Sequence, residues 1–146
     1  MSTVISRLKR RLRGMTVYSD LALRTAYGFD ATGARGICRA VVFPRSGEQL
    51  QLIAAETAAL GLNMVVRGAG TGFSGGSVPP ENSIVISTER MNRILSFNPL
   101  NEEVEVEAGV VNGKLQQFLE GEGFFYPPDP ASFRVSTIGG NIAENA

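Results

Sequence analysis

A glycine-rich loop is the feature that most constrains the fold of this chain. Residues 65–78 read VVRGAGTGFSGGSV, and five of the nine residues from Gly68 to Gly76 are glycine. Glycine adopts positive φ freely and lets other groups approach the main chain, although it loses more conformational entropy on folding. The stretch could be a flexible linker, but the strand-like sequences NMVV before it and SIVIS after it indicate a fixed turn. We therefore expect the loop to bind an anion.

A strand, a helix and a second strand lead into the loop. The sequence AVVF at 40–43 predicts a buried strand, Ser46 opens a capping box, and Gly61 is placed to end the helix as its left-handed cap. Residues 63–66 predict the next strand, which runs parallel to the first in a βαβ unit, and residues 83–87 predict a third. The loop thus leaves the carboxyl end of a parallel strand, where open α/β sheets bind ligands.

The pattern changes after the third strand. Residues 93–97 predict a strand, a turn follows at Asn98-Pro99, and glutamates then alternate with apolar residues over 103–108. Such strict alternation is typical of an antiparallel strand with one exposed face. A second helix is expected at about 112–122. We therefore expect a parallel unit followed by the start of an antiparallel one.

The glycine loop does not match either of two familiar nucleotide-binding motifs. Gly70, Gly72 and Gly75 spell the dinucleotide fingerprint G-x-G-x-x-G, but that motif requires a helix directly afterwards. Here Val-Pro-Pro follows at 78–80 and prevents one. The spacing also fits the first half of a P-loop, but Gly76 stands where the lysine belongs. The Rossmann and P-loop interpretations are both excluded.

What remains is a concave loop of main-chain N–H groups, which binds oxyanions without a helix. Arg67 stands at the start of this loop, and the hydroxyls of Thr71, Ser74 and Ser77 add donors suited to a pyrophosphate. We expect Arg67 to face the phosphates; the alternative is a surface ion pair, which contributes little.

Composition excludes several classes of protein. The 146 residues have 43% hydrophobic content and zero formal net charge, which indicates one domain and argues against a nucleic-acid surface. Cys38 is the only cysteine, so an intrachain disulfide and a cysteine metal cluster are excluded. The sequence has no histidine, and therefore lacks the commonest metal ligand and the usual general base.

The first segment is basic and amphipathic. It reads STVISRLKRRLRG over 2–14, with one apolar face formed by Val4, Ile5, Leu8 and Leu12. We expect a solvated helix forming a basic extension over 1–20, ahead of a domain over 21–146. Peripheral contact with a membrane surface is the alternative. The segment lacks the apolar core of a signal peptide, so a cytoplasmic location is expected.

The last segment carries polar groups on a stiff backbone. It reads YPPDPASFRVSTIGGNIAENA over 126–146, and its three prolines restrict the main chain. Its short polar side chains could form an ordinary turn, or could face a ligand together with the glycine loop; they are Asp129, Ser132, Ser136 and Thr137. The chain stops soon after an apparent helix start, so we expect a truncated domain.

Three separated motifs carry a family resemblance: RGAGTGFSGG at 67–76, PPDPAS at 127–132 and STIGGNIAENA at 136–146. In this order they resemble the FAD-linked oxidases, and YGFDATG at 27–33 and STERMNRI at 87–94 also fit. The nearest group is similar to the glycolate oxidase D subunit and the FAD-dependent D-lactate dehydrogenases. The resemblance implies an α+β FAD-binding domain of the vanillyl-alcohol-oxidase type, with a small parallel βαβ subdomain followed by the start of a mixed or antiparallel subdomain.

The resemblance also implies which residues hold FAD. The glycine loop would embrace the pyrophosphate, and the last segment would line the isoalloxazine and ribityl-phosphate region. The implied cofactor-binding residues are Arg67, Gly68, Ala69, Gly70, Thr71, Gly72, Phe73, Ser74, Gly75, Gly76, Pro128, Asp129, Ser132, Ser136, Thr137, Gly139, Gly140, Asn141 and Ala143. Some members of the wider fold bond the flavin covalently through a histidine in the glycine loop. Thr71 stands at the comparable position, which implies non-covalent FAD.

The implied activity of the full-length parent is oxidation of a small 2-hydroxy acid, such as glycolate or D-lactate, with a possible electron-acceptor subunit. The cap that binds the substrate in such proteins is not in this sequence, so no catalytic residue and no metal site is assigned. We expect the chain alone to bind FAD weakly, to be inactive and to self-associate through exposed apolar side chains; the candidates are Phe73, Ile138, Ile142 and residues 124–126. Two alternatives stay open: another oxidoreductase on the same fold, such as a cell-wall precursor reductase, or a non-catalytic nucleotide-binding module.

Overall fold

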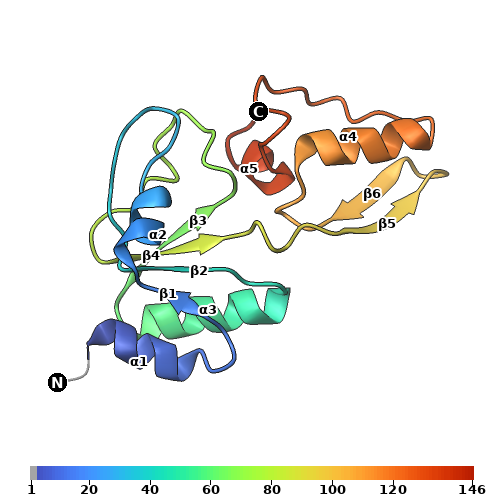
Figure 1. The fold of residues 1–146 in the computed structure, drawn as a ribbon. Helices are drawn as coiled ribbons and strands as arrows, with labels where there is room; N and C mark the ends of the chain where they lie inside the picture. The colour runs from blue at the N-terminus through green and yellow to red at the C-terminus, as the bar shows by residue number, and fades with distance from the viewer. Residues whose placement is uncertain (1–2) are drawn as a thin grey trace.

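Two groups of elements follow one another in the computed structural model, which describes residues 3–146 (Figure 1). The first group forms a four-stranded sheet with its helices: α1 (Val4–Arg11), β1 (Val17–Tyr18), α2 (Leu21–Ala26), β2 (Ala40–Val42), α3 (Gly47–Ala59), β3 (Asn63–Arg67) and β4 (Ser83–Ser87). The second forms a hairpin with a covering helix and a last short helix: β5 (Ile94–Asn98), β6 (Glu103–Val106), α4 (Asn112–Gly121) and α5 (Ile138–Ala143). The predicted order of a parallel unit and then an antiparallel one is confirmed.

The four-stranded sheet has the order β1-β2-β4-β3. Strands β2 and β3 run parallel as predicted, but each pairs with β4, which lies between them; Val85 is the register partner of both Val41 and Val65. All five residues of β4 are buried because the strand is central and covered on both faces. The antiparallel edge strand β1, in which Val17 pairs with Val42, was not expected from the sequence.

Helix α3 begins and ends where its sequence predicts. The Ser46 side chain accepts a hydrogen bond from the Gln49 N–H at 3.3 Å, and the Gln49 amide oxygen accepts from the Arg45 N–H at 2.8 Å. Gly61 has φ +65° and ends the helix as a left-handed residue. The start and the end of α3 are therefore both determined by residues close to them in the sequence.

The basic helix α1 presents different faces to the solvent and to the sheet. Leu8 and Leu12 are fully buried in the core cluster that contains Val42 and Ile84 of the sheet. Arg11 forms an ion pair of 2.6 Å with Glu56, so α1 lies beside α3 (Figure 1). The basic face of the helix is exposed to solvent as predicted, while its apolar face packs against the sheet, because that contact removes it from water.

No helix among residues 3–146 has both the length and the apolar character needed to cross a membrane.

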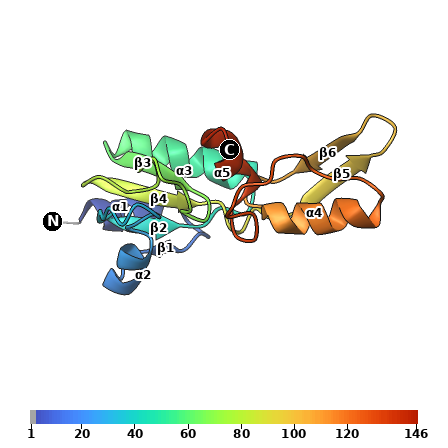
Figure 2. The same cartoon turned by 90° about the horizontal axis from the view of Figure 1, so that it is seen from above.

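The hairpin β5–β6 is covered on one face by α4 (Figure 2). Phe97 of the hairpin makes edge-to-face contacts with Phe118 and Phe124, at centroid distances of 5.8 and 5.3 Å. The predicted alternation holds up to Val106 and then reverses, since Glu107 is 8% exposed and Ala108 is exposed. Glu107 is turned inward because Arg93 binds its carboxylate.

The apolar side chains expected to be exposed divide into two groups. Phe73, Phe125 and Ile142 are 79%, 73% and 71% exposed. Ile138 is only 5% exposed and lies in the core between the hairpin and α4, so it is removed from the expected apolar patch. Phe124 and Tyr126 are half-buried against the same core.

Candidate cofactor site

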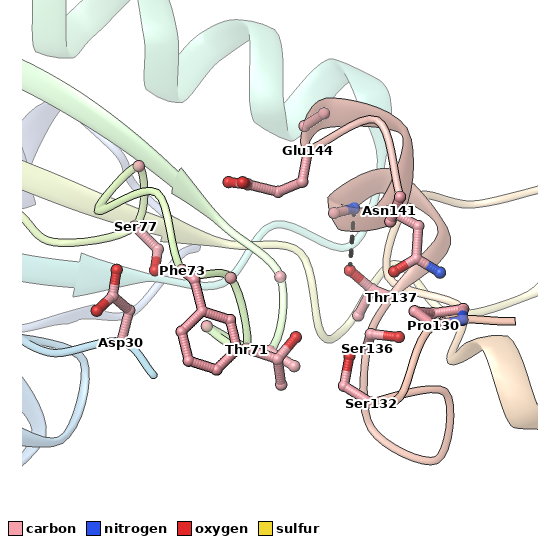
Figure 3. A pocket seen from close by; sticks show the side chains of 18 of the residues that line it. Asp30, Thr71, Phe73, Ser77, Pro130, Ser132, Ser136, Thr137, Asn141 and Glu144 are labelled. Atoms are coloured by element: carbon pink, nitrogen blue, oxygen red, sulfur yellow. Dashed lines mark hydrogen bonds between the residues drawn. The ribbon is translucent and has the colours of Figure 1, made fainter. Parts of the chain in front are cut away.

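A cavity of about 600 Å³ lies between the glycine loop and the last segment of the chain (Figure 3). One wall is the loop that follows β3, and the other comprises residues 130–137 and helix α5. The volume falls within the range of about 300–1,000 Å³ that is common for small-molecule sites. The two motifs that lie furthest apart in the sequence therefore face one another in space.

Most of the predicted site residues line this cavity. They are Gly68, Ala69, Gly70, Thr71, Gly72, Phe73, Gly76, Ser132, Ser136, Thr137, Gly140, Asn141 and Ala143. The cavity lining does not include six others: Arg67, Ser74, Gly75, Pro128, Asp129 and Gly139. The sequence analysis did not select several residues that do line it, among them Asp30, Val66, Pro130, Ala131 and Glu144.

Arg67 lies behind the glycine loop rather than at its mouth. Its side chain is buried, and its Nη1 donates to the Phe29 carbonyl at 2.6 Å and to the Ser77 hydroxyl at 3.4 Å. The guanidinium also lies 5.6 Å from the centroid of the Tyr27 ring. Burial lowers the pKa of Arg67 from its usual value. The alternative of a surface ion pair is wrong, because the side chain is buried and joins no ion pair in residues 3–146. Contact with the phosphates stays a prediction, and Arg67 is not among the residues that line the cavity.

The glycines of the loop are required for two different reasons. Gly70 has φ +72°, and a β-carbon there would collide with the Arg67 guanidinium. Gly75 has φ +81° but nothing within 4 Å of an added β-carbon. At Gly68 a β-carbon would collide with the Thr137 hydroxyl of the opposite wall. The loop thus combines left-handed backbone with contacts too close for any side chain.

The opposite wall is fixed to the hairpin unit by main-chain hydrogen bonds. The Ile138 N–H donates to the Val110 carbonyl at 2.8 Å, and the Gly139 N–H donates to the Ala108 carbonyl at 2.9 Å. The Thr137 hydroxyl caps α5 by accepting from the Gly140 N–H at 3.3 Å. This wall is therefore positioned by a second unit that folds around its own core.

Three buried polar atoms of the cavity lining have no hydrogen-bond partner among residues 3–146. They are Asp30 Oδ2, Ser136 Oγ and Asn141 Nδ2, on side chains that are 4%, 3% and 5% exposed. Buried polar atoms are normally paired, and each exception calls for an explanation. One carboxylate acceptor, one hydroxyl and one amide donor are thus available to a polar ligand.

Asp30 is a lining residue that sequence reasoning missed. Its Oδ1 accepts hydrogen bonds from the N–H and hydroxyl of Thr32, and the hydroxyl contact is the main reason that the pKa of Asp30 lies below its usual value. The D-x-T turn was visible in the sequence, but its burial against the glycine loop depends on contacts far along the chain. Glu144 gave no local signal at all, because its placement follows from the packing of α5.

The fold and the site together define the class of protein. It is a ligand-binding domain whose cavity lies between a parallel-sheet unit and a helix-covered hairpin unit. Residues 38–146 match the family model described as "FAD binding domain", and the chain belongs to this family. The prediction of an FAD-linked oxidase is thereby confirmed, and FAD is the cofactor of the domain.

Similar proteins include glycolate oxidase subunit GlcD of Bacillus subtilis (strain 168), which is 37% identical over 124 residues, covering 84% of this chain and 26% of the relative. D-2-hydroxyglutarate dehydrogenase of Stutzerimonas stutzeri (strain A1501) is 39% identical over 144 residues, covering 98% and 31%. The chain thus spans about a quarter to a third of the length of these relatives.

Solved structures confirm the fold class. Alkyldihydroxyacetonephosphate synthase superposes with a TM-score of 0.84 at 22% identity, over 96% of this chain and 28% of that chain. p-Cresol methylhydroxylase with substrate bound superposes with 0.82 at 17% identity, over 95% and 29%. At such identities the likeness concerns the fold alone: an α+β FAD-binding domain of the vanillyl-alcohol-oxidase type.

The residues present fit FAD. A diphosphate needs main-chain donors that no side chain of the loop blocks, and the loop lines the cavity with Gly68, Gly70, Gly72 and Gly76, which carry none. The unpaired Ser136 hydroxyl and Asn141 amide supply further donors on the facing wall.

Proposed function

We propose that this chain supplies part of the FAD site of a flavoenzyme that oxidises a small 2-hydroxy acid, such as glycolate or D-lactate, to the 2-keto acid. The observation that carries the proposal is the cavity between the glycine loop and α5, with unpaired buried groups at Asp30, Ser136 and Asn141. The names of similar proteins, a glycolate oxidase subunit and a D-2-hydroxyglutarate dehydrogenase, support the substrate class.

Each wall has its own task in this proposal. The main-chain N–H groups of residues 68–76 bind the diphosphate, and Arg67 keeps the loop in shape from behind. Ser136 and Asn141 hold the part of the cofactor nearer the flavin ring by donating hydrogen bonds. When bound, FAD supplies the two-electron acceptor, and the protein supplies orientation and electrostatics.

We propose that the cofactor is held without a covalent bond. The sequence has no histidine, and Thr71 lines the cavity at the position expected for a histidine linkage. Groups that choose and deprotonate the substrate belong to residues outside this sequence. We also propose that an electron-acceptor subunit is a partner of the full-length protein, and the relative that is named as a subunit supports this. The location proposed for the protein is the cytoplasm, with at most peripheral contact with a membrane.

The test uses the protein encoded by the whole reading frame that includes residues 1–146. Bound flavin is measured by absorbance after gel filtration, and dye reduction is assayed with glycolate, D-lactate and D-2-hydroxyglutarate. We expect one flavin per chain, released by denaturation without proteolysis, and reduction with at least one of the three acids. A folded protein without flavin would contradict the proposed cofactor, and a flavoprotein reduced by none of the acids would contradict the substrate class.

The Gly70→Val variant tests whether the cofactor binds at the glycine loop. Left-handed backbone costs a non-glycine residue about 1–2 kcal/mol, and the added side chain also displaces the Arg67 guanidinium. We expect flavin to be lost while circular dichroism stays close to that of the wild type. The matched control is Gly75→Val, which is also left-handed but has open space, and which should retain more flavin. Equal retention by wild type and Gly70→Val would refute the loop assignment.

A further inference from the structure

The cavity holds a carboxylate at the glycine loop. Glu144 directly follows α5 and extends across the cavity toward the loop (Figure 3). The Ser74 hydroxyl donates to its Oε1 at 2.7 Å. A β-carbon added at Gly72 would lie 3.2 Å from its Cδ and its Oε1, and one added at Gly76 would lie 3.4 Å from its Oε1. A carboxylate of the chain itself is thus seated against three residues of the loop that is proposed to bind an anion.

The carboxylates around the cavity lower its affinity for an anion as long as Glu144 stays at the loop. Glu144 forms no ion pair with any residue in the described range 3–146. A second carboxylate, Asp30, lines the same cavity. The nearest buried cation, Arg67, lies behind the loop and uses its Nη1 on Phe29 and Ser77. A diphosphate entering the loop would therefore meet two like charges and a guanidinium that is already engaged.

The Glu144 side chain can leave the loop without unfolding its helix. The residue is exposed, and its carboxylate has one hydrogen bond within the described part of the chain, from Ser74. Its main-chain N–H donates to the Gly140 carbonyl at 3.0 Å, which holds the backbone independently of the side chain. Rotation of the side chain alone is enough to free the loop.

We propose that Glu144 competes with anionic ligands for the Ser74–Gly76 part of the glycine loop, and that its carboxylate leaves this position when a diphosphate binds. This inference rests on the proposed FAD site and identifies Glu144 as a residue that determines how tightly that site binds its ligand. The Glu144 side chain lowers the affinity for the cofactor, while the end of α5 is held by the main chain. A carboxylate and a phosphate oxygen suit the same donors, because both are oxyanions that accept from hydroxyl and N–H groups.

The test is the Glu144→Gln variant, which keeps the shape of the side chain and removes its charge. The control is Glu122→Gln, at the exposed end of α4 and outside the cavity lining. Dissociation constants for FAD and for inorganic pyrophosphate are measured by calorimetry on flavin-stripped protein from the whole reading frame. We expect Glu144→Gln to bind both ligands roughly fivefold more tightly than wild type, from the repulsion of one like charge near the surface. Glu122→Gln should match wild type.

The possible outcomes separate this inference from the proposed function. Unchanged or weaker binding of both ligands by Glu144→Gln overturns the competition, while FAD binding itself stands. Tighter pyrophosphate binding without any FAD binding supports the competition and overturns the proposed cofactor. If neither ligand binds to a folded protein, both are overturned. Glu144→Thr provides a second neutral side chain if the glutamine variant does not fold.

Discussion

The two walls of the cavity are held in place by different kinds of interaction. The glycine loop is held from behind by one buried side chain, Arg67, which links it to Phe29 through a hydrogen bond of 2.6 Å. The facing wall is held by main-chain bonds, from Ile138 to Val110 and from Gly139 to Ala108. One wall therefore depends on a particular side chain, and the other depends on the close approach of backbones.

The two units behind these walls also differ in the size of their cores. The parallel sheet has buried clusters on both faces, with every residue of β4 buried between them. The hairpin has one cluster, under α4, and Leu95 and Leu100 are 47% and 94% exposed. The hairpin unit therefore has the smaller core, and its position depends more on its contacts with the sheet unit.

The largest effect is expected for Gly109→Ala, at the junction of the two units. A β-carbon there would collide with the Thr88 carbonyl oxygen and lie 2.7 Å from the Met91 carbonyl oxygen. Both obstacles are backbone atoms, so the chain has to shift, and we expect a loss of about 3 kcal/mol in unfolding free energy. Chemical denaturation measures it.

The control for the junction is Gly121→Ala in α4, where nothing lies within 4 Å of an added β-carbon. Because Gly121 is the last, exposed residue of the helix, this substitution should change the stability by no more than about 0.5 kcal/mol. If Gly109→Ala were as stable as Gly121→Ala, the close approach of the two units would be refuted.

The next effect in size is expected for Arg67→Ala, which removes the side chain behind the glycine loop. A hydrogen bond from a charged group contributes about 1.5–3 kcal/mol, and the Phe29 carbonyl would lose its donor. We expect a loss of that size in stability and a roughly tenfold to hundredfold weaker affinity for FAD, caused by the loosened loop. Thermal denaturation and flavin titration measure the two effects.

Arg10→Ala is the matched control, because Arg10 is exposed on α1 and forms no ion pair in the described residues 3–146. Its effect should stay within about 0.5 kcal/mol. A weaker affinity for FAD with no loss of stability in Arg67→Ala would restore a direct contact between Arg67 and the phosphates.

The smallest effect is expected from Glu107 at acid pH. Arg93 donates to this carboxylate at 2.7 Å, and this hydrogen bond holds the pKa of Glu107 below its value of 4.5 in an unfolded chain. A lowered pKa stabilises the fold at pH values above 4.5, and this stabilisation is lost as the pH falls through the folded-state pKa. Glu107→Gln should therefore be less stable than wild type near neutral pH and lose less stability on acidification.

Thermal unfolding between about pH 6 and about pH 3 measures this difference. Glu105→Gln, on the exposed face of β6, is the control and should follow the wild-type curve. Parallel acid curves for wild type and Glu107→Gln would show that Glu107 does not anchor the hairpin.

Much of the fold could be predicted because its signals are local. The start of α3 at Ser46, its end at Gly61 and the turn between β5 and β6 each depend on residues a few positions apart. The glycine loop was visible for the same reason, since Gly70 and Gly75 adopt the positive φ that glycine permits. The expected alternation failed at Glu107, where Arg93, the residue just before β5, binds the carboxylate and outweighs the local pattern.

The sequence by itself determined most of the elements from β2 onward, their order, the glycine loop and the family, but not β1 or α2. Only the tertiary structure decided that β4 lies between β2 and β3, that Arg67 turns inward, and that Glu144 reaches the glycine loop. Arg67 and Phe29 are 38 residues apart, and Ser74 and Glu144 are 70 residues apart. Side-chain direction at such positions depends on which surfaces meet when the two units pack, and no pattern along a single segment contains that information.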